Sequence, residues 1–227
     1  MSQDDARGDS PLKTRSGHGI DVAIQRGDFL DGSAVRQIRQ LVVQRNGVRA
    51  LDAACAAGGQ ALRMARAGAM VTAVDLHDDG MALLRAAASE GLTQIDFVQA
   101  DLRNAGLYQR LGRFDLIIAQ RFIHYLPFPE AVDVLKLFHS ALLPEGRLYI
   151  SASGLRSELG QHYHGAPDVA ERLSPLWPPM AGKHGIHGKV CLYEEQDMLA
   201  LLAAAGMRPE KVYASPFGNI KGIACRN

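Results

Sequence analysis

Three aspartates stand at the ends of apolar segments in the first half of the chain. Asp52, Asp75 and Asp101 each follow a short run rich in Val, Ala, Ile or Leu. In open parallel sheets, ligands bind beyond the carboxyl ends of the strands, so these side chains would border one crevice. Carboxylates accept hydrogen bonds from hydroxyls and exocyclic amines, which suits Asp75 to ribose and Asp101 to adenine. The set predicts a nucleoside site.

The segment after Asp52 is a loop of small residues, AACAAGG. The near absence of bulky side chains lets a ligand approach the backbone and the N-terminus of the next helix. The helix dipole there favours an anionic group. We therefore expect ligand contacts from the loop residues Asp52, Ala54, Cys55, Ala56 and Gly58.

Each aspartate also has a local interpretation. Asp52 would cap the following loop, Asp75 would be the N-cap of the helix that contains Met81, and Asp101 would begin an Asx-turn. Capping alone gives no reason for aspartates at the ends of three successive strands. The joint placement therefore favours the nucleoside site.

A second group of reactive residues follows the predicted fourth strand, in the segment QRFIHYLP. His124 can take a proton from a hydroxyl, thiol or amine, and Arg121 can pair with a carboxylate or phosphate. With Tyr125, these residues are candidates for a catalytic pocket wall. The alternative is that His124 and Tyr125 make structural hydrogen bonds, and both interpretations stay open.

The elements that position these residues alternate between buried strands and helices. Strands that are continuous Val, Ile, Leu and Ala are buried on both faces, which is typical of a parallel, doubly wound sheet. Strands are expected at residues 48–54, 70–76, 95–102, 114–120 and 147–153, with helices at 33–44, 59–69, 81–91, 107–111 and 129–143.

The first of these helices carries its own pattern. Residues Val35, Ile38, Leu41 and Val42 share one helical face, Ser33 is the expected cap, and Asn46-Gly47 ends the helix.

The C-terminal region adds a helix at 194–206 and two strands, 211–217 and 220–226, joined by a Gly218-Asn219 turn. This pattern predicts an antiparallel hairpin at the sheet edge. The expected fold class is α/β: a doubly wound, mostly parallel, seven-stranded Rossmann-like sheet with a C-terminal antiparallel hairpin.

Between sheet and hairpin, residues 154–192 form an insert rich in Gly, His and Pro. Loops of this length usually have a function, so we expect a substrate lid with contacts from Tyr163, Trp177 and His184. The pairs His162/His164 and His184/His187 allow a metal site as the alternative, but their spacing is not specific and no metal is expected. Residues 18–31 are expected to fold over the same mouth.

We expect residues 1–19 to be a flexible tail and 20–227 to form one domain that includes the insert. Lys plus Arg total 25 and Asp plus Glu total 24, without a basic run, which argues against a nucleic-acid partner. Three distant cysteines and the lack of a long apolar segment indicate a cytoplasmic protein that is neither exported nor inserted in a membrane. A monomer or homodimer is expected.

The motifs LDAACAAGGQA, AVDLH, VQADL, FDLIIAQRFIHYL and LLPEGRLYIS occur in an order and spacing that resembles class I S-adenosylmethionine-dependent methyltransferases. The resemblance spans roughly residue 48 to the C-terminus. It implies S-adenosylmethionine (SAM) as cofactor, with the loop from Asp52 to Gly58 at its methionine end. It further implies the ribose at Asp75 with Leu76 beside it, the adenine at Asp101 and Leu102, and Gln120 near the methyl sulfonium.

The loop departs from the family pattern at two positions. Ala54 and Ala56 stand where the family usually has glycine, and only Gly58 of the expected three remains. An added methyl group would push the cofactor outward or shift the loop, and alanine is poor wherever φ is positive.

The expected function is therefore SAM-dependent methyl transfer to the O, N or S atom of a small molecule. One alternative is a nucleoside-binding or SAM-binding protein without catalysis, suggested by Ala54 and Ala56. A protein or nucleic-acid methyltransferase is another, although it would need a wide, charged cleft. Transfer of a different group, such as aminopropyl, from the same cofactor also stays open.

Overall fold

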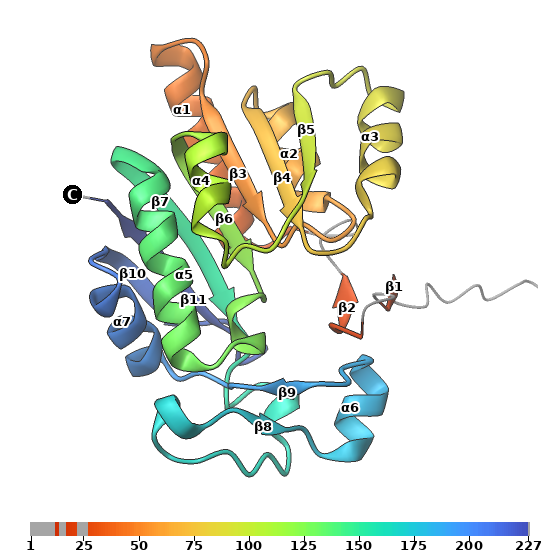
Figure 1. The fold of residues 1–227 in the computed structure, drawn as a ribbon, viewed down its shortest axis with the longest axis vertical. Helices are drawn as coiled ribbons and strands as arrows, with labels where there is room; N and C mark the ends of the chain where they lie inside the picture. The colour runs from red at the N-terminus through yellow and green to blue at the C-terminus, as the bar shows by residue number, and fades with distance from the viewer. Residues whose placement is uncertain (1–11, 14–16, 22–26, 227) are drawn as a thin grey trace, which may run out of the picture.

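The computed structural model describes residues 12–13, 17–21 and 27–226 of the chain, and its centre is a seven-stranded sheet (Figure 1). The strand order is β10-β11-β7-β6-β3-β4-β5. Strands β3 to β7 are parallel to one another. Strand β11 pairs antiparallel with β7, and β10 pairs antiparallel with β11. The bounds are β3 Arg49–Ala53, β4 Met70–Asp75, β5 Ile95–Gln99, β6 Phe114–Gln120, β7 Leu142–Ala152, β10 Arg208–Ala214 and β11 Ile220–Cys225. The predicted fold class is confirmed.

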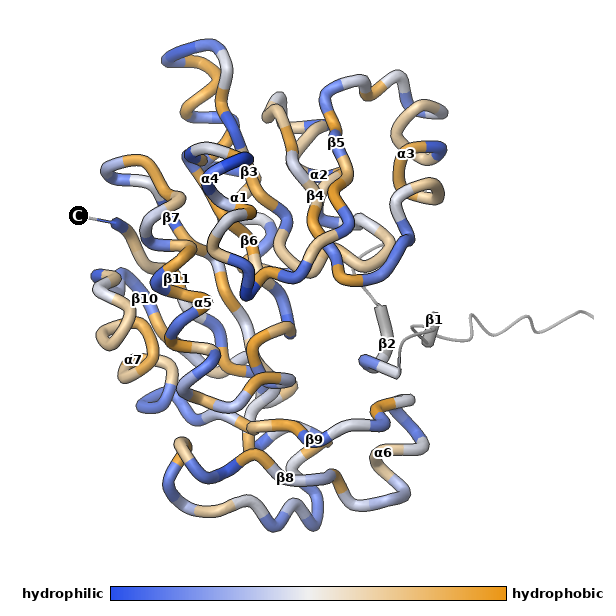
Figure 2. Tube along the Cα trace, in the orientation of Figure 1, coloured by the Kyte–Doolittle hydropathy of each residue, from blue (hydrophilic) through white to orange (hydrophobic). Residues whose placement is uncertain are grey.

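Helices cover both faces of the sheet. One face packs against α1 Phe29–Gln44, α2 Gly59–Arg66 and α3 Gly80–Ser89. The other packs against α4 Ala105–Leu111, α5 Phe128–Ala141 and α7 Glu195–Ala204. Figure 2 shows the apolar residues concentrated along the strands that these helices enclose.

The two covered faces of β6 explain why residues 116–119 are all apolar. Leu116 and Ile118 belong to the core under α1 to α3, whereas Ile117 and Ala119 belong to the core under α4, α5 and α7. Side chains alternate between the two faces of a strand, so a sheet covered on both faces needs apolar residues at every position. Burial on both faces fixes the end of the strand and therefore the place of Gln120.

The start of α1 differs from the sequence prediction. The helix begins at Phe29, with Asp28 as N-cap, so the predicted start at Ser33 is wrong. The Asp28 carboxylate accepts from the Leu30 and Asp31 amides, and the Asp31 carboxylate accepts from the Asp28 amide at 2.6 Å. This reciprocal capping box satisfies amide groups that Ser33 cannot reach, because Ser33 instead donates to the carbonyl of Phe29.

The other elements match their predicted positions with shifted ends. The largest shift is at β7, which begins at Leu142, immediately after α5 ends at Ala141. The hairpin of β10 and β11 is present, with a register shift between Pro209 and Lys211. The hairpin turn contains Gly218 at a φ of 74°.

The insert lies across the carboxyl ends of the parallel strands (Figure 1). It contains the two-stranded pair β8 Ser174–Pro175 and β9 Lys189–Val190, the helix α6 Pro178–His184, and 3-10 turns at Glu158–Gly160 and Val169–Glu171. Arg172 fastens it to α7: the guanidinium pairs with buried Asp197 and donates to the carbonyls of Ala166, Pro167 and Leu192.

Part of the predicted tail falls within the described residues. Strand β1 Leu12–Lys13 pairs with β2 Ile20–Asp21. Residues 17–19 run along the insert, since the His187 amide donates to the Gly17 carbonyl at 3.1 Å and the Gly19 amide to the Gly185 carbonyl at 3.3 Å. The remainder of the predicted tail lies outside the described residues, and its flexibility and the proposed domain limits stay predictions.

Two findings bear on the environment of the chain. Within the part of the chain that the structure describes, no helix combines the length and apolar character needed to cross a membrane. The three cysteines, Cys55, Cys191 and Cys225, are buried and free.

Candidate functional site

A cavity of about 1080 Å³ lies where the carboxyl ends of the parallel strands face the insert. We name its two sides the strand-end wall and the insert wall. The strand-end wall comes from the ends of β3 and β4 and from the loops after β3, β4 and β5, and it consists of Asp52, Ala54, Cys55, Ala56, Asp75, Leu76, His77, Asp79, Ala100, Asp101, Leu102 and Arg103. The insert wall combines the insert with the segments after β6 and β7 and the hairpin turn, and it consists of Arg121, Phe122, His124, Tyr125, Leu126, Ser153, Arg156, Ser157, Glu158, Leu159, His184, Ile186, Ser215, Pro216, Phe217 and Asn219.

Asp52 and Asp75 are buried carboxylates that organise the strand-end wall. Asp52 accepts from the amide of Ala61 in the first turn of α2 at 2.8 Å. Asp75 accepts from the Ala56 amide at 2.9 Å and from the His77 amide at 3.0 Å. Each oxygen of Asp75 therefore has one backbone donor and a further lone pair, so the side chain is oriented and can still accept hydrogen bonds.

The loop between Asp52 and α2 has an unusual backbone. Ala54 and Ala56 adopt φ values of 58° and 46°, in the left-handed region that favours glycine. The sequence prediction of strain at these positions therefore has a structural basis. Gly58, at a φ of 82°, is not among the cavity-lining residues, and a Cβ there would meet Leu83 at 2.4 Å. Gly58 serves loop geometry and packing against α3.

Asp101 and Leu102 line the outer part of the strand-end wall. Asp101 is half-exposed and pairs with Arg103 at 2.7 Å, and Arg103 also reaches Glu130 at 3.2 Å. The hydrogen bonds from Arg103 lower the pKa of Asp101. The carboxylate is therefore ionised at neutral pH and accepts hydrogen bonds. Leu102 is buried, and its carbonyl accepts from Tyr108 at 2.7 Å.

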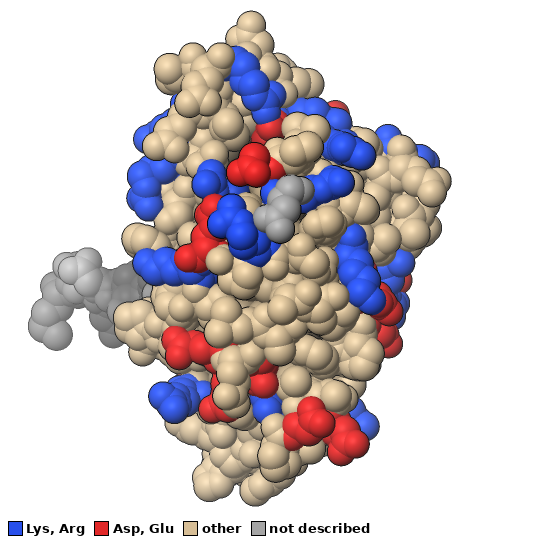
Figure 3. Space-filling view, turned by 90° about the vertical axis from the view of Figure 1, so that its left-hand side faces the viewer, with Lys and Arg blue, Asp and Glu red and all other residues tan. Residues whose placement is uncertain are grey.

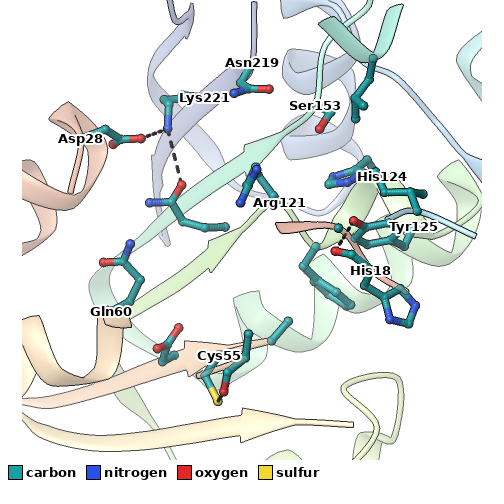
Figure 4. A pocket seen from close by; sticks show the side chains of 18 of the residues that line it. His18, Asp28, Cys55, Gln60, Arg121, His124, Tyr125, Ser153, Asn219 and Lys221 are labelled. Atoms are coloured by element: carbon teal, nitrogen blue, oxygen red, sulfur yellow. Dashed lines mark hydrogen bonds and ion pairs between the residues drawn. The ribbon is translucent and has the colours of Figure 1, made fainter. Parts of the chain in front are cut away.

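One end of the cavity is closed by a polar network, of which the sequence analysis had assigned only Gln120 to the ligand site. It consists of Asp28, Asp31, Gln60, Gln120, Ser151 and Lys221. Figure 4 shows Lys221 reaching from β11 toward Asp28. The only sequence signals were the Asp28-x-x-Asp31 capping pattern and one lysine inside an apolar strand.

Gln120 is the centre of this polar network. Its amide nitrogen donates to Asp31, and its oxygen accepts from Ser151 at 2.9 Å and from Lys221 at 3.5 Å. Because donors lie on one side and an acceptor on the other, the amide has one orientation. Burial raises the pKa of Asp31, the carboxylate beside it.

The residues after β6 form the start of the insert wall. Arg121 has a φ of 50°, and its amide donates to the Ser151 carbonyl at 2.9 Å and hydroxyl at 3.1 Å. A strained non-glycine residue directly after a strand often marks a functional site. His124 follows in a 3-10 turn, Ile123–Tyr125.

His124 is only 1% exposed yet lines the cavity. Its Nδ1 is buried and has no hydrogen-bond partner among the described residues. Burial, reinforced by the charge of Arg121, lowers the pKa of His124 to about 3. The ring is therefore neutral at physiological pH and offers a nitrogen as hydrogen-bond acceptor.

Tyr125 ties the N-terminal segment to this wall. Its hydroxyl donates to the carbonyl of His18 at 2.6 Å, and the two rings meet edge to face at 4.9 Å. Burial raises the pKa of Tyr125 to about 12, so it is a hydrogen-bond donor at neutral pH. The residues of this segment that border the cavity are His18, Gly19, Gly27, Asp28, Phe29 and Asp31, as expected for a segment that folds over its mouth.

Of the three predicted lid residues, one lines the cavity and two do not. His184 lines the cavity and pairs with Glu158 at 3.0 Å. Tyr163 and Trp177 are not among the lining residues. Tyr163 donates to the carbonyls of Arg172 and Val190 inside the insert, and Trp177 packs against His162 with ring centres 4.5 Å apart.

The described residues offer no metal cluster, and their surface charges are mixed (Figure 3). None of the His, Cys, Asp and Glu residues there form a group of three or more that could hold a metal ion. On the face drawn in Figure 3, acidic and basic side chains lie next to one another.

Residues 50–146 match the model of a family described as a methyltransferase domain. A curated relative, the ubiquinone biosynthesis O-methyltransferase of Xanthomonas axonopodis pv. citri, is 31% identical over 105 residues, which cover 46% of this chain and 43% of the relative. The chain thus matches less than half the length of this relative.

Solved structures share the fold at low sequence identity. An S-adenosylmethionine-dependent methyltransferase from Clostridium acetobutylicum has a TM-score of 0.65 and 13% identity, covering 88% of this chain and 92% of that one. The magnesium protoporphyrin IX methyltransferase of Synechocystis PCC 6803, solved with bound SAM, has a TM-score of 0.59 and 18% identity, covering 91% and 88%. Residues 50–146 of this chain are therefore similar to a methyltransferase domain, and the chain shares its fold with these S-adenosylmethionine-dependent methyltransferases.

Proposed function

We propose that this chain binds SAM and transfers its methyl group to the oxygen, nitrogen or sulfur of a small molecule. The observation that carries the proposal is one cavity with two kinds of wall. The strand-end wall offers oriented carboxylates to a nucleoside, and the insert wall holds a buried, neutral histidine with an unpartnered nitrogen.

The residues present fit the cofactor. Asp75 keeps lone pairs for two ribose hydroxyls after accepting from Ala56 and His77. Asp101, whose oxygens already accept from Arg103, would share that acceptor capacity with an exocyclic amine, and buried Leu102 and exposed Leu76, which line the same cavity, provide apolar surface for a ring. The loop from Ala54 to Ala56 presents backbone to the cavity, with alanine methyl groups as its only bulk there besides Cys55.

When bound, SAM supplies an electrophilic methyl group on sulfur, so the nucleophile–carbon bond forms as the sulfur–carbon bond breaks. The chain's own contribution is then to align the acceptor and exclude water. Neutral His124 accepts a hydrogen bond from a protonated nucleophile and so orients its lone pair; because the lowered pKa of the ring keeps it from holding the proton, that proton would pass on to solvent as the nucleophile–carbon bond forms. Tyr125 and His18 close the wall beside it.

The insert supports a small acceptor. Its residues Glu158, Leu159, His184 and Ile186 enclose the cavity opposite the sheet, and residues 18–19 run across it. A macromolecular acceptor needs an open approach to the reacting atom, which these segments obstruct. The relatives named after ubiquinone biosynthesis and magnesium protoporphyrin IX agree with an acceptor of this class.

A catalytically silent SAM-binding protein is the second candidate. The left-handed backbone of Ala54 and Ala56 favours this candidate, because a strained loop would position the bound cofactor less well for methyl transfer.

Calorimetric titration with SAM, S-adenosylhomocysteine (SAH) and NAD tests the cofactor. Micromolar binding of SAM and SAH without NAD binding supports the proposal, and absence of SAM and SAH binding contradicts it. A radiolabelled-methyl assay against small-molecule acceptors then separates the candidates, because a silent protein binds SAM yet forms no methylated product.

A further inference from the structure

We infer that the methyl acceptor carries a carboxylate, which the insert wall binds through Arg156, beside Asn219 and Ser153. The inference rests on the proposed function and names the substrate class for the same cavity.

The three side chains come from two loops that touch through glycines. A Cβ on Gly218 would lie 2.4 Å from the carbonyl carbon and oxygen of Arg156, and a Cβ on Gly154 would lie 2.1 Å from the oxygen of Gly218. This backbone-to-backbone approach fixes the loop after β7 against the hairpin turn. Arg156 and Asn219, distant in sequence, therefore line one part of the cavity.

Among the described residues, the cavity carboxylates that form ion pairs do so with cations other than Arg156. Glu158, the insert-wall carboxylate, is bound by Lys183 and His184. Asp28 is bound by Lys221, and Asp101 by Arg103. No ion pair or hydrogen bond links the Arg156 guanidinium to another residue of the described chain, although it borders the cavity.

Two neutral groups that line the same cavity as Arg156 also keep their hydrogen-bonding capacity. Neither the Ser153 hydroxyl nor the Asn219 side-chain amide makes a hydrogen bond within the described part of the chain. Figure 4 shows Ser153, Asn219, Arg121 and His124 around one space. Arg156 lines the same cavity, and its backbone contacts the hairpin turn that carries Asn219. A guanidinium, a hydroxyl and an amide together provide N–H and O–H donors for a carboxylate, and one such cation matches a single negative charge.

The rest of this wall indicates what the carboxylate is attached to. Leu126, Leu159 and Ile186 are buried apolar residues that line the same cavity, and His124 accepts a hydrogen bond from a hydroxyl or amine. The acceptor that fits is an apolar, often aromatic, carboxylic acid with a separate nucleophile directed at His124.

Binding of matched acids and amides tests the inference. The full chain, saturated with SAH, is titrated with hydroxybenzoate, caffeate and indoleacetate, each beside its carboxamide. We expect acids to bind about tenfold or more tightly than their amides, since the amide removes a charge-assisted hydrogen bond. In Arg156→Gln this preference should fall to about twofold, whereas Arg85→Gln, an exposed arginine on α3, should keep it.

Each outcome decides the point. Equal binding of acids and amides, an unchanged preference in Arg156→Gln, or no acid bound below about 10 mM overturns the inference. Titration of each variant with SAH alone comes first: retained SAH affinity shows that Arg156→Gln folds. If wild type fails to bind SAH, the proposed function fails, and acid titrations without SAH still report on Arg156.

Discussion

The two walls of the cavity are built in different ways. The carboxylates of the strand-end wall accept from backbone amides close in sequence, as Asp75 does from His77 and Asp52 from Ala61. The insert wall depends on contacts between distant segments, such as Arg172 with Asp197 and Tyr125 with the carbonyl of His18. Because its hydrogen bonds are local, the strand-end wall can be recognised from sequence motifs. The insert wall cannot, because its contacts join residues that are far apart in the sequence.

The largest expected effect tests the anchor of the insert wall. Arg172→Met removes the partner of buried Asp197 and strands three carbonyl groups, so the free energy of unfolding should fall by about 3–5 kcal/mol. Urea unfolding measures this. The control, Arg66→Met, breaks an exposed pair with Glu90 and should leave the free energy of unfolding close to that of wild type.

SAH titration of Arg172→Met sharpens the comparison. If the walls are built independently, the variant should keep wild-type SAH affinity at low temperature, where it stays folded. A stability change as small as that of Arg66→Met, or a large loss of SAH affinity, would contradict the separation of the two walls.

Asp75→Ala breaks the strand-end wall. It removes the acceptor for two ribose hydroxyls and the bond that holds the Ala56 amide, so SAH binding should weaken by about 1.5–3 kcal/mol or more. Calorimetry measures the change, with Asp78→Ala, an exposed neighbour outside the cavity lining, as control. Unchanged affinity in Asp75→Ala would remove the ribose assignment.

His124 links the insert wall to pH. Its pKa is about 3 in the folded chain and near 6.5 when unfolded, so the unfolded state binds the extra proton between these values. Stability is therefore complete above pH 6.5 and falls as pH decreases, by about 1.4 kcal/mol per unit.

His124→Asn should remove this acid sensitivity. Urea unfolding at pH 7.5 and pH 5.5 compares wild type, His124→Asn and the exposed control His164→Asn. At pH 5.5, wild type and the control should each have lost about 1.4 kcal/mol more than His124→Asn relative to their values at pH 7.5. Parallel profiles for all three proteins would show that His124 is not held neutral.

The sequence predicted the sheet and its strand ends because burial on both faces leaves a continuous apolar run, as in β6. It missed the start of α1, since Asp28 and Asp31 lie in a polar stretch without helical periodicity. Lys221 was equally hidden: its importance comes from Asp28 and Gln120, which reach it from other elements.

The lid residues show the same limit. Aromatic side chains in a loop rich in Gly and Pro have no periodicity that tells which face they occupy, and Tyr163 turned inward to the insert's own carbonyls. The loop after β3 is the opposite case. The departure from the family pattern at Ala54 and Ala56 is visible in the sequence because it is local, and both residues have a left-handed backbone.

The smallest expected effect concerns these two alanines. A left-handed backbone destabilises the folded state by about 1–2 kcal/mol when the residue is alanine and by about nothing when it is glycine. Glycine, however, stabilises the unfolded chain by about 0.4–1 kcal/mol, because it gives that chain more conformational entropy. Ala54→Gly and Ala56→Gly should therefore each raise the free energy of unfolding by about 0–1 kcal/mol, although glycine normally destabilises. Ala88→Gly, exposed in α3, should lower it by about 1 kcal/mol.

SAM titration of the same variants decides what the methyl groups do in the strand-end wall. If they only crowd the ligand and strain the backbone, affinity in Ala54→Gly and Ala56→Gly should equal or exceed that of wild type. A marked loss of affinity would mean that the loop is built around the alanines, whose restricted backbone holds the amide of Ala56 on Asp75. The strained conformation would then be a requirement of this site, rather than a defect inherited from lost glycines.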